Sequence, residues 1–416
     1  MKISDLRRSR TGRHVRLSAT VAWEESNRDP VEVHYDVPEE FANGLVPSAN
    51  AFLVASVFPA TAAGERRIAV DGEVCPRLLS GLRTALSLFD IWYGTESADI
   101  AIEAPIATTA QRSSGAPPRA GAFFTGGIDS LTTLRRNRLM FAPSHPESIK
   151  DAVLLYGINF DSDDRLETFD DAVKELSVVT RSVGAALVPV FTNARRVLNP
   201  DIDFFRYKYH GALLAAAAHI LDGRLSTMSI GSSHDYRHLM PWGSHPLLDG
   251  NLGSAHLRLY HDSQELSRFA KTRLVSEWEA GLQNIKVCVT NWPGRNCGAC
   301  EKCRRTMLAL VALNALDRCN AFAVRAVDPD AVRSIQVASD SQSSFYVELV
   351  APLRRAGRED LANAVEFILK RYRGELGWRG GLKLADRRYF GGGLTTMKRR
   401  FGGATSMLVA TSVLVS

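Results

Sequence analysis

The run Ala122-Phe-Phe-Thr-Gly-Gly-Ile-Asp-Ser130 constrains the fold of this chain more than any other segment. Its apolar start is typical of the end of a buried strand, Thr125-Gly126-Gly127 predicts a tight turn, and the residues from Asp129 onward open a helix. In such a strand–turn–helix unit, glycines let backbone N–H groups approach oxygen atoms closely. The helix dipole favours negative charge at the same place. The segment therefore predicts a cradle for an anion.

The side chains of this loop favour the phosphates of a nucleotide as that anion. Thr125 and Ser130 offer hydroxyl donors, and the Asp129 carboxylate is a ligand for a Mg²⁺ ion that bridges phosphates. The loop is not a Walker A motif, because no Gly-Lys-Ser/Thr follows it, and it lacks the dinucleotide fingerprint. A Gly-Gly turn without a ligand is the alternative. The predicted ATP contacts in the loop are Thr125, Gly126, Gly127, Ile128, Asp129 and Ser130.

Predicted strands and helices alternate from residue 119 to about 320, which is the pattern of an α/β fold with a doubly wound, mostly parallel sheet. In such sheets, ligands bind beyond the carboxyl ends of the strands. Two further predicted strands end at Gly157-Ile-Asn159 and at Gly231-Ser-Ser233. We expect these segments to join the loop in one site, with Gly231 and Ser232 among the ATP contacts.

Three further segments complete the predicted organisation. Residues 1–112 predict an N-terminal α+β domain, with a hairpin over 14–35, strands at 51–58, 67–70 and 100–103, and a helix over 78–89. A linker at 113–120 leads to the α/β domain at 121–320. Residues 321–416 predict a helical extension followed by a glycine-rich, basic tail from Gly374.

Four of the six cysteines form a compact cluster in the sequence: Cys288, Cys297, Cys300 and Cys303. A Cys-x-x-Cys turn places two sulfurs on one side of a tight loop, and a second arm can complete a tetrahedron. Four thiolates without histidine favour a closed structural Zn²⁺ site. An iron–sulfur cluster, a redox Cys-x-x-Cys pair and a chance cluster are the alternatives.

The loop resembles the PP-loop, Ser-Gly-Gly-x-Asp-Ser, of the ATP pyrophosphatase superfamily, with Thr125 in place of the first serine. The cysteine spacing, followed at once by Arg304 and a helix, is similar to the zinc motif of the 7-cyano-7-deazaguanine synthases. This resemblance covers about residues 120–312 and implies a PP-loop, HUP-like core. It also implies ATP cleavage between the α- and β-phosphates, adenylation of a 7-carboxy-7-deazaguanine-like carboxylate, and conversion with ammonia to the amide and then the nitrile.

The resemblance implies roles for three more residues. Tyr156 and Gly157, after the second strand of the α/β segment, would line the adenine pocket. Lys271 is the best match to a family lysine whose cation would neutralise the departing pyrophosphate, and an exposed helix lysine is the alternative. The segment His234–Asp249 has no counterpart in the family pattern. It offers His234 or His245 as a base and Trp242 as a surface for a flat heterocycle.

Three functions stay open. The first is a carbon–nitrogen ligase that acts on a small heterocyclic carboxylate. The second is a modifier of a macromolecule, by tRNA thiolation or by joining a deazaguanine to a protein or nucleic acid, similar to accessory-bearing relatives in anti-phage systems. The third is a non-catalytic nucleotide-binding subunit.

The chain has 416 residues and a net charge of +6, which is compatible with a solvated surface or with an RNA partner. A protein partner and a homodimer also stay open. No stretch of about 18 apolar residues predicts a membrane span. ATP chemistry and thiolate ligands together indicate the cytoplasm.

Overall fold

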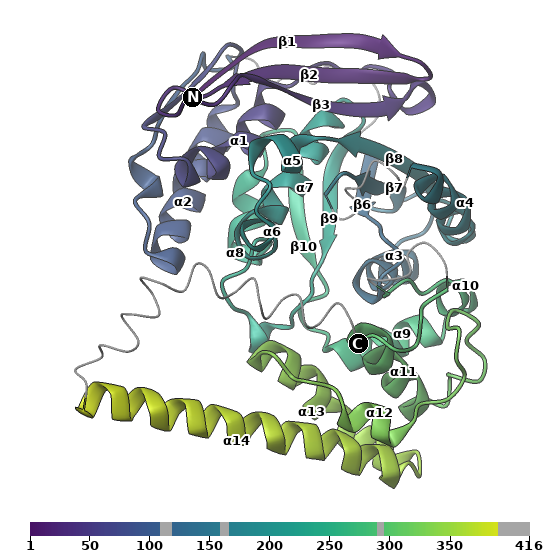
Figure 1. Cartoon of the computed structure of the whole chain (residues 1–416). Coiled ribbons are helices and arrows are strands. Elements are labelled where there is room, and N and C mark those ends of the chain that lie inside the picture. The colour runs from purple at the N-terminus through teal and green to yellow at the C-terminus, as the bar shows by residue number, and fades with distance from the viewer. Residues whose placement is uncertain (109–118, 159–165, 289–294, 390–416) are drawn as a thin grey trace. The chain divides into compact units, whose positions relative to one another are not determined.

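The computed structural model describes residues 1–108, 119–158, 166–288 and 295–389 (Figure 1). Most of the expected linker, Asn159 and the chain beyond Tyr389 lie outside these residues. The chain divides into two compact units, Met1–Ala326 and Val327–Ser416, and the second is described as far as Tyr389. No helix among the described residues is both long enough and apolar enough to cross a membrane.

The first unit is built on a ten-stranded sheet with the order β10-β9-β6-β7-β8-β3-β2-β1-β4-β5. All neighbours are parallel except in the run from β8 through β3 and β2 to β1. The strands are β1 (Lys2–Thr11), β2 (His14–Ala22), β3 (Val31–Pro38), β4 (Arg67–Val70), β5 (Ala101–Glu103), β6 (Arg119–Phe123), β7 (Ile149–Tyr156), β8 (Ala186–Thr192), β9 (Leu225–Gly231) and β10 (Arg258–Asp262). The predicted α/β class with a mostly parallel sheet is therefore confirmed.

Helices cover both faces of the parallel strands (Figure 1). α3 (Ile128–Met140) and α4 (Leu166–Ser182) pack on one face. The other face carries α1 (Ala49–Ala62), α5 (Ala194–Leu198) and α7 (His210–Ile220). α7 is rich in alanine, which lets it lie close to α1, and nearly all of its residues are buried.

The strand predicted at 51–58 is wrong, because these residues lie inside α1. Residues 51–60 are all buried, since the helix lies among β1, β4, α5 and α7 and exposes no polar face there. A continuous apolar run of this kind carries no period that separates a strand from a helix. Strands β1 and β10 were not among the sequence-based expectations.

The N-terminal segment is part of the same sheet as the α/β segment. β3 pairs with β8 through Tyr35 and Thr192 and through Asp36 and Phe191. The buried apolar residues of both segments also form one continuous core. The two regions that the sequence predicts as separate domains, 1–112 and 121–320, therefore share one structural unit.

The chain order of the parallel strands creates a switch point. After β6 the chain builds β7 and β8 on one side, then crosses over to build β9 and β10 on the other. The carboxyl ends of β6 and β9 therefore face a crevice in which an open α/β sheet binds its ligands. The contact there is close, because a Cβ on Gly231 would lie 3.0 Å from the backbone of Asp129.

The remaining helices of the first unit are short or lie outside the two layers. They are η1 (Glu39–Phe41), α2 (Pro76–Tyr93), η2 (Ser97–Asp99), α6 (Ile202–Phe204), η4 (Phe205–Tyr209), η5 (Tyr236–His238), α8 (Pro246–Asp249), η6 (Gly250–Leu252), α9 (Arg268–Ser276), α10 (Glu279–Gln283) and α11 (Glu301–Ala312).

The second unit is helical, as expected for the C-terminal extension. It consists of α12 (Pro329–Arg333), α13 (Asp340–Arg355) and α14 (Glu359–Tyr389). Helix α14 continues through Gly374, so the predicted start of a glycine-rich tail at that residue is wrong. The helix contains four glycines, at 374, 377, 380 and 381, and each costs about 1 kcal/mol relative to alanine.

Asp151 in β7 ties three strands together, and its replacement tests the sheet. Its fully buried carboxylate accepts hydrogen bonds at 2.8 and 3.0 Å from Arg224, which precedes β9, and at 3.3 Å from Arg119 in β6. We expect Asp151→Ala to lower the free energy of unfolding by about 3 kcal/mol, because it leaves two cations without their partner. Urea denaturation measures this change.

Asp171→Ala is the matched control, since Asp171 forms an exposed ion pair with Lys174 on α4. Its effect should stay below about 0.5 kcal/mol. Equal losses in the two variants would contradict the role assigned to Asp151.

Candidate functional site

The glycine loop joins β6 to α3 by a turn that only glycine can make. Gly126 has a φ of +74°, and a Cβ there would lie 2.6 Å from the side chain of Leu176 in α4. The Gly126 carbonyl accepts a hydrogen bond from the Lys286 N–H at 2.8 Å. The loop is therefore held between α4 and the segment that leads to the cysteines.

The first turn of α3 is open to an anion. Gly127 occupies the N-cap position, and no side chain caps the helix. The Ser130 hydroxyl donates to the Gly127 carbonyl at 3.0 Å and accepts from the Thr125 N–H at 3.3 Å, so it braces the loop. N–H groups at an uncapped helix start are ready donors for a phosphate.

Asp129 is paired with two cations of α9. Its carboxylate lies 3.0 Å from Arg268 Nη2 and 3.5 Å from Lys271 Nζ. Burial by itself would raise the pKa of the Asp129 carboxyl, but these cations outweigh it and hold the pKa below its ordinary value. Asp129 is the only acidic residue that lines the cavity described below, within the described part of the chain. A Mg²⁺ ion would thus take one protein carboxylate and most of its ligands from phosphates.

Lys271 is a buried residue, with only 1% of its surface exposed. Besides facing Asp129, its ammonium donates to the carbonyl of Ser232 at the end of β9. Burial lowers the pKa of Lys271, and the Asp129 carboxylate opposes that shift. The alternative of an exposed helix lysine is wrong, since Lys271 joins the loop to β9.

A cavity of about 350 Å³ lies at the switch point between β6 and β9. Two cations, Arg206 and Lys302, line it together with the loop, which suits an anionic ligand. Apolar and aromatic side chains supply walls for a flat heterocycle. Of the predicted residues, the cavity brings together Thr125, Gly127, Asp129, Ser130, Gly231, Ser232, His234, Trp242 and His245.

Tyr156 and Gly157 line a second cavity of about 440 Å³, together with residues of β2, β3, α4, β8 and α5. The Tyr156 ring packs against Phe169 and Phe191 at 4.9 and 5.5 Å between centroids. Gly157 is required by packing, because a Cβ there would lie 1.8 Å from the Thr192 carbonyl oxygen. The structure does not bring these two residues to the loop cavity, which receives the next residue, Ile158.

Four histidines line the loop cavity: His210, His234, His245 and His261. Burial, together with the nearby Arg268 cation, lowers the pKa of His234 to about 4, so this ring is neutral at neutral pH. His245 accepts a hydrogen bond from the Leu247 N–H at 3.1 Å and thereby caps α8. His210 and His261 were not predicted as site residues. For His261 the available signal was the alternation of polar and apolar residues in 256–259, which leads into β10.

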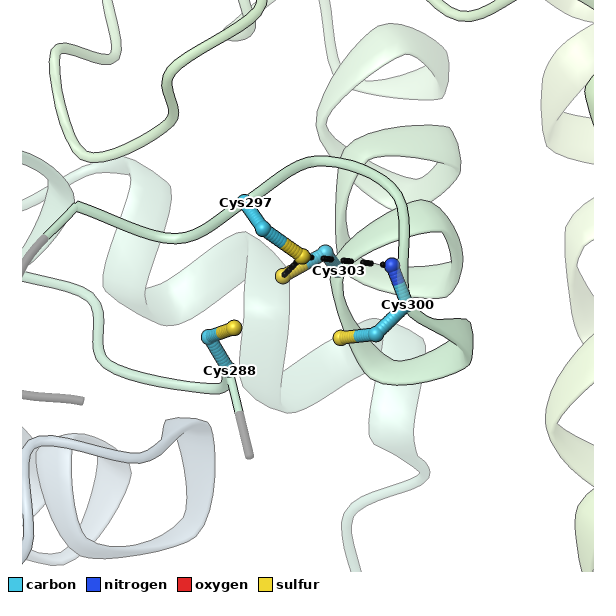
Figure 2. A group of neighbouring side chains, drawn as sticks. All are labelled: Cys288, Cys297, Cys300 and Cys303. Carbon is cyan, nitrogen blue, oxygen red and sulfur yellow. Dashed lines mark hydrogen bonds between the residues drawn. The ribbon is translucent and has the colours of Figure 1, made fainter. Parts of the chain in front are cut away.

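The four cysteines converge in space, as the sequence predicts (Figure 2). Cys288 approaches from one arm, and Cys297, Cys300 and Cys303 come from a turn and the first residues of α11. All four sulfurs lie within 4.8 Å of one another. The Cys297 sulfur accepts the Cys300 N–H at 3.3 Å, which is the hydrogen bond of a tight Cys-x-x-Cys turn.

Asn296 holds the two arms of this cluster together, and the sequence analysis missed it. Its side-chain oxygen accepts the N–H groups of Val287 and Cys288 at 2.8 and 2.9 Å. Its side-chain nitrogen donates to the carbonyls of Ile285 and Ala321 at 2.7 and 2.9 Å. Asparagine is so often a surface residue that no local pattern marks this role.

The cysteine cluster could bind a metal ion. The hydrogen bond with Cys300 and burial raise the pKa of the Cys303 thiol, so this sulfur by itself resists becoming a thiolate. A bound cation reverses this preference, because it stabilises thiolate ligands. Lys302 lies between Cys300 and Cys303 and lines the cavity, so the cluster also positions a residue of the loop site.

In comparisons with protein-family models, curated proteins and solved structures, this chain matches none.

Metal content tests the cysteine cluster. We expect the purified protein to carry one Zn²⁺ per chain, and Cys300→Ser to lose most of it together with several degrees of thermal stability, because one of four ligands is lost. Elemental analysis and thermal unfolding measure both effects.

Cys75→Ser is the control, since the Cys75 sulfur accepts the Ala255 N–H at 3.3 Å outside the cluster. It should keep its zinc. Iron with visible absorption would identify a cluster of the iron–sulfur type instead, and full zinc content in Cys300→Ser would contradict the ligand set.

Proposed function

We propose that this protein is a PP-loop, ATP-dependent carbon–nitrogen ligase that adenylates the carboxylate of a heterocycle such as 7-carboxy-7-deazaguanine. Ammonia then converts the acyl adenylate to an amide or nitrile, with release of AMP and pyrophosphate. One observation carries the proposal. A single cavity at the switch point joins an uncapped helix start, cationic side chains and apolar and aromatic side chains.

The phosphates of ATP would lie on the glycine loop. The N–H groups at the start of α3 would bind phosphate oxygens, and the loop has no Walker lysine that would direct it to the γ-phosphate. Asp129 would hold a Mg²⁺ ion together with phosphate oxygens, and such an ion would neutralise charge on the leaving pyrophosphate. If Mg²⁺ took the place of Arg268 beside Asp129, the Arg268 guanidinium would be able to bind the phosphates.

The cations around the loop explain why catalysis can rest on positioning. Lys271, Arg268, Lys302 and Arg206 come from three different segments and surround one crevice. In such a site, fixed positive charge stabilises charge that develops in the transition state without reorganisation. The substrate carboxylate would attack the α-phosphorus in line.

Zinc in the cysteine cluster would have a structural role in this proposal. Its four cysteine ligands complete a tetrahedron and leave no position for a substrate. Their contribution is to hold the start of α11, and with it Lys302, beside the loop.

Pyrophosphate release tests the proposal. We expect release from ATP to depend on 7-carboxy-7-deazaguanine, and Asp129→Ala to slow it by about 100-fold or more, because the variant loses a Mg²⁺ ligand and the partner of two cations. Asp171→Ala removes an exposed carboxylate on α4 and should keep the full rate.

The other outcomes separate the alternatives. An unchanged rate in Asp129→Ala would exclude the assignment of the loop. Release that depends on tRNA or on a protein, and not on the small molecule, would identify a modifier of macromolecules. ATP binding without pyrophosphate release would indicate a non-catalytic nucleotide-binding subunit.

A further inference from the structure

His261 and Asp249 form a buried hydrogen-bonded pair at the wall of the loop cavity. His261 Nδ1 lies 2.8 Å from Asp249 Oδ2, and the two side chains are 7% and 0% exposed. His261 comes from β10 and lines the cavity, whereas Asp249 ends α8. A carboxylate only accepts hydrogen bonds, so Nδ1 carries a proton. The neutral ring then has a free lone pair on Nε2.

Asp249 is held in a fixed position. The Ser244 hydroxyl donates to its Oδ2 at 2.7 Å. Its Oδ1 is buried and has no hydrogen-bond partner among the described residues. A Cβ on Gly211 would lie 2.7 Å from this oxygen, so the backbone of α7 closes the space around it. Burial of an incompletely hydrogen-bonded carboxylate lowers the stability of the fold, which indicates a functional role for Asp249.

The same arrangement is absent at two other histidines of the cavity. His210 Nδ1 donates to the Arg206 carbonyl at 3.0 Å, and His245 Nδ1 accepts the Leu247 N–H. Each of these bonds is made with the backbone, so neither ring is hydrogen-bonded to a carboxylate. The Asp249 charge acts on both rings only through space, where it opposes the lowering of their pKa by burial. A histidine oriented by a buried carboxylate is the arrangement that general-base catalysis uses.

We propose that His261 is the general base for the nucleophile, and that Asp249 positions it. This inference rests on the proposed adenylating function. When ammonia attacks the acyl adenylate, the new C–N bond forms and the C–O bond to AMP breaks. AMP leaves with the electron pair of that bond. The proton lost by the nitrogen passes to His261 Nε2 and then to water, and the Asp249 carboxylate stabilises the imidazolium.

The two half-reactions can be measured separately. Exchange of labelled pyrophosphate into ATP, with 7-carboxy-7-deazaguanine present, reports adenylation. Formation of amide with ammonium reports attack by the nucleophile. His261→Asn is the informative variant, because its amide nitrogen can keep the bond to Asp249 while Nε2 is lost. We expect exchange within about 3-fold of the wild type and amide formation slower by about 100-fold or more.

Hydroxylamine distinguishes a base from a structural residue. Its nitrogen is less basic than that of ammonia, so the proton that it must lose after attack passes to water with less help from a base. We expect His261→Asn to recover most of its rate with hydroxylamine. Asp249→Asn should lose amide formation by about tenfold or more and show the same recovery, because its His261 would adopt the wrong tautomer. His256→Gln, just before β10 and away from the cavity lining, is the matched control and should resemble the wild type.

Three results would overturn the inference. One is unchanged amide formation in His261→Asn. Another is equal loss of exchange and amide formation in a folded His261→Asn or Asp249→Asn, which would indicate a structural role. The third is hydroxamate formation from hydroxylamine that is reduced in the variants as strongly as amide formation from ammonia. Each of these results requires that the wild-type protein catalyses the exchange of pyrophosphate into ATP. A wild type without exchange would instead remove the proposed function, and the inference with it.

Discussion

The ionic contact between the glycine loop and α9 is the interaction on which the site depends. Asp129 at the start of α3 pairs with Arg268 and Lys271, and Lys271 also reaches the carbonyl of Ser232 after β9. These bonds connect the carboxyl ends of β6 and β9 across the switch point. Because the lysine is buried, its charge is uncompensated without Asp129. The same carboxylate that could bind Mg²⁺ therefore also keeps the crevice assembled.

The cysteine cluster supports the wall of the crevice next to α9, since α11 packs against that helix. Asn296 joins the arm of Cys288 to the turn of Cys297, and the following helix carries Lys302 to the cavity wall. Residue 286, just before Cys288, is hydrogen-bonded to the loop at Gly126. A metal ion bound by the cysteines would thus stabilise the loop and the cationic wall together, without contact with a substrate.

Local signals predicted the parts of the site that lie within one segment. The strand–turn–helix of the loop, the convergence of the four cysteines and the meeting of the loop with Gly231 all follow from short patterns and from a general rule for parallel sheets. Helix α1 was missed because burial on every side removes the periodicity that marks a helix. Tyr156 lines a second cavity and not the loop cavity. The reason is that β3 pairs with β8 and covers the sheet near the carboxyl end of β7.

The sequence by itself determined the strand–turn–helix of the loop and the clustering of the four cysteines. Backbone N–H groups, glycine turns and ligand spacing are properties of consecutive residues, and they act wherever the segment folds. Only the tertiary structure decided which other side chains share the cavity. His261, Asp249 and Arg206 come from a strand and from two short helical segments, all outside the loop. They meet through the order of the strands and the close packing of α7, which no single segment encodes.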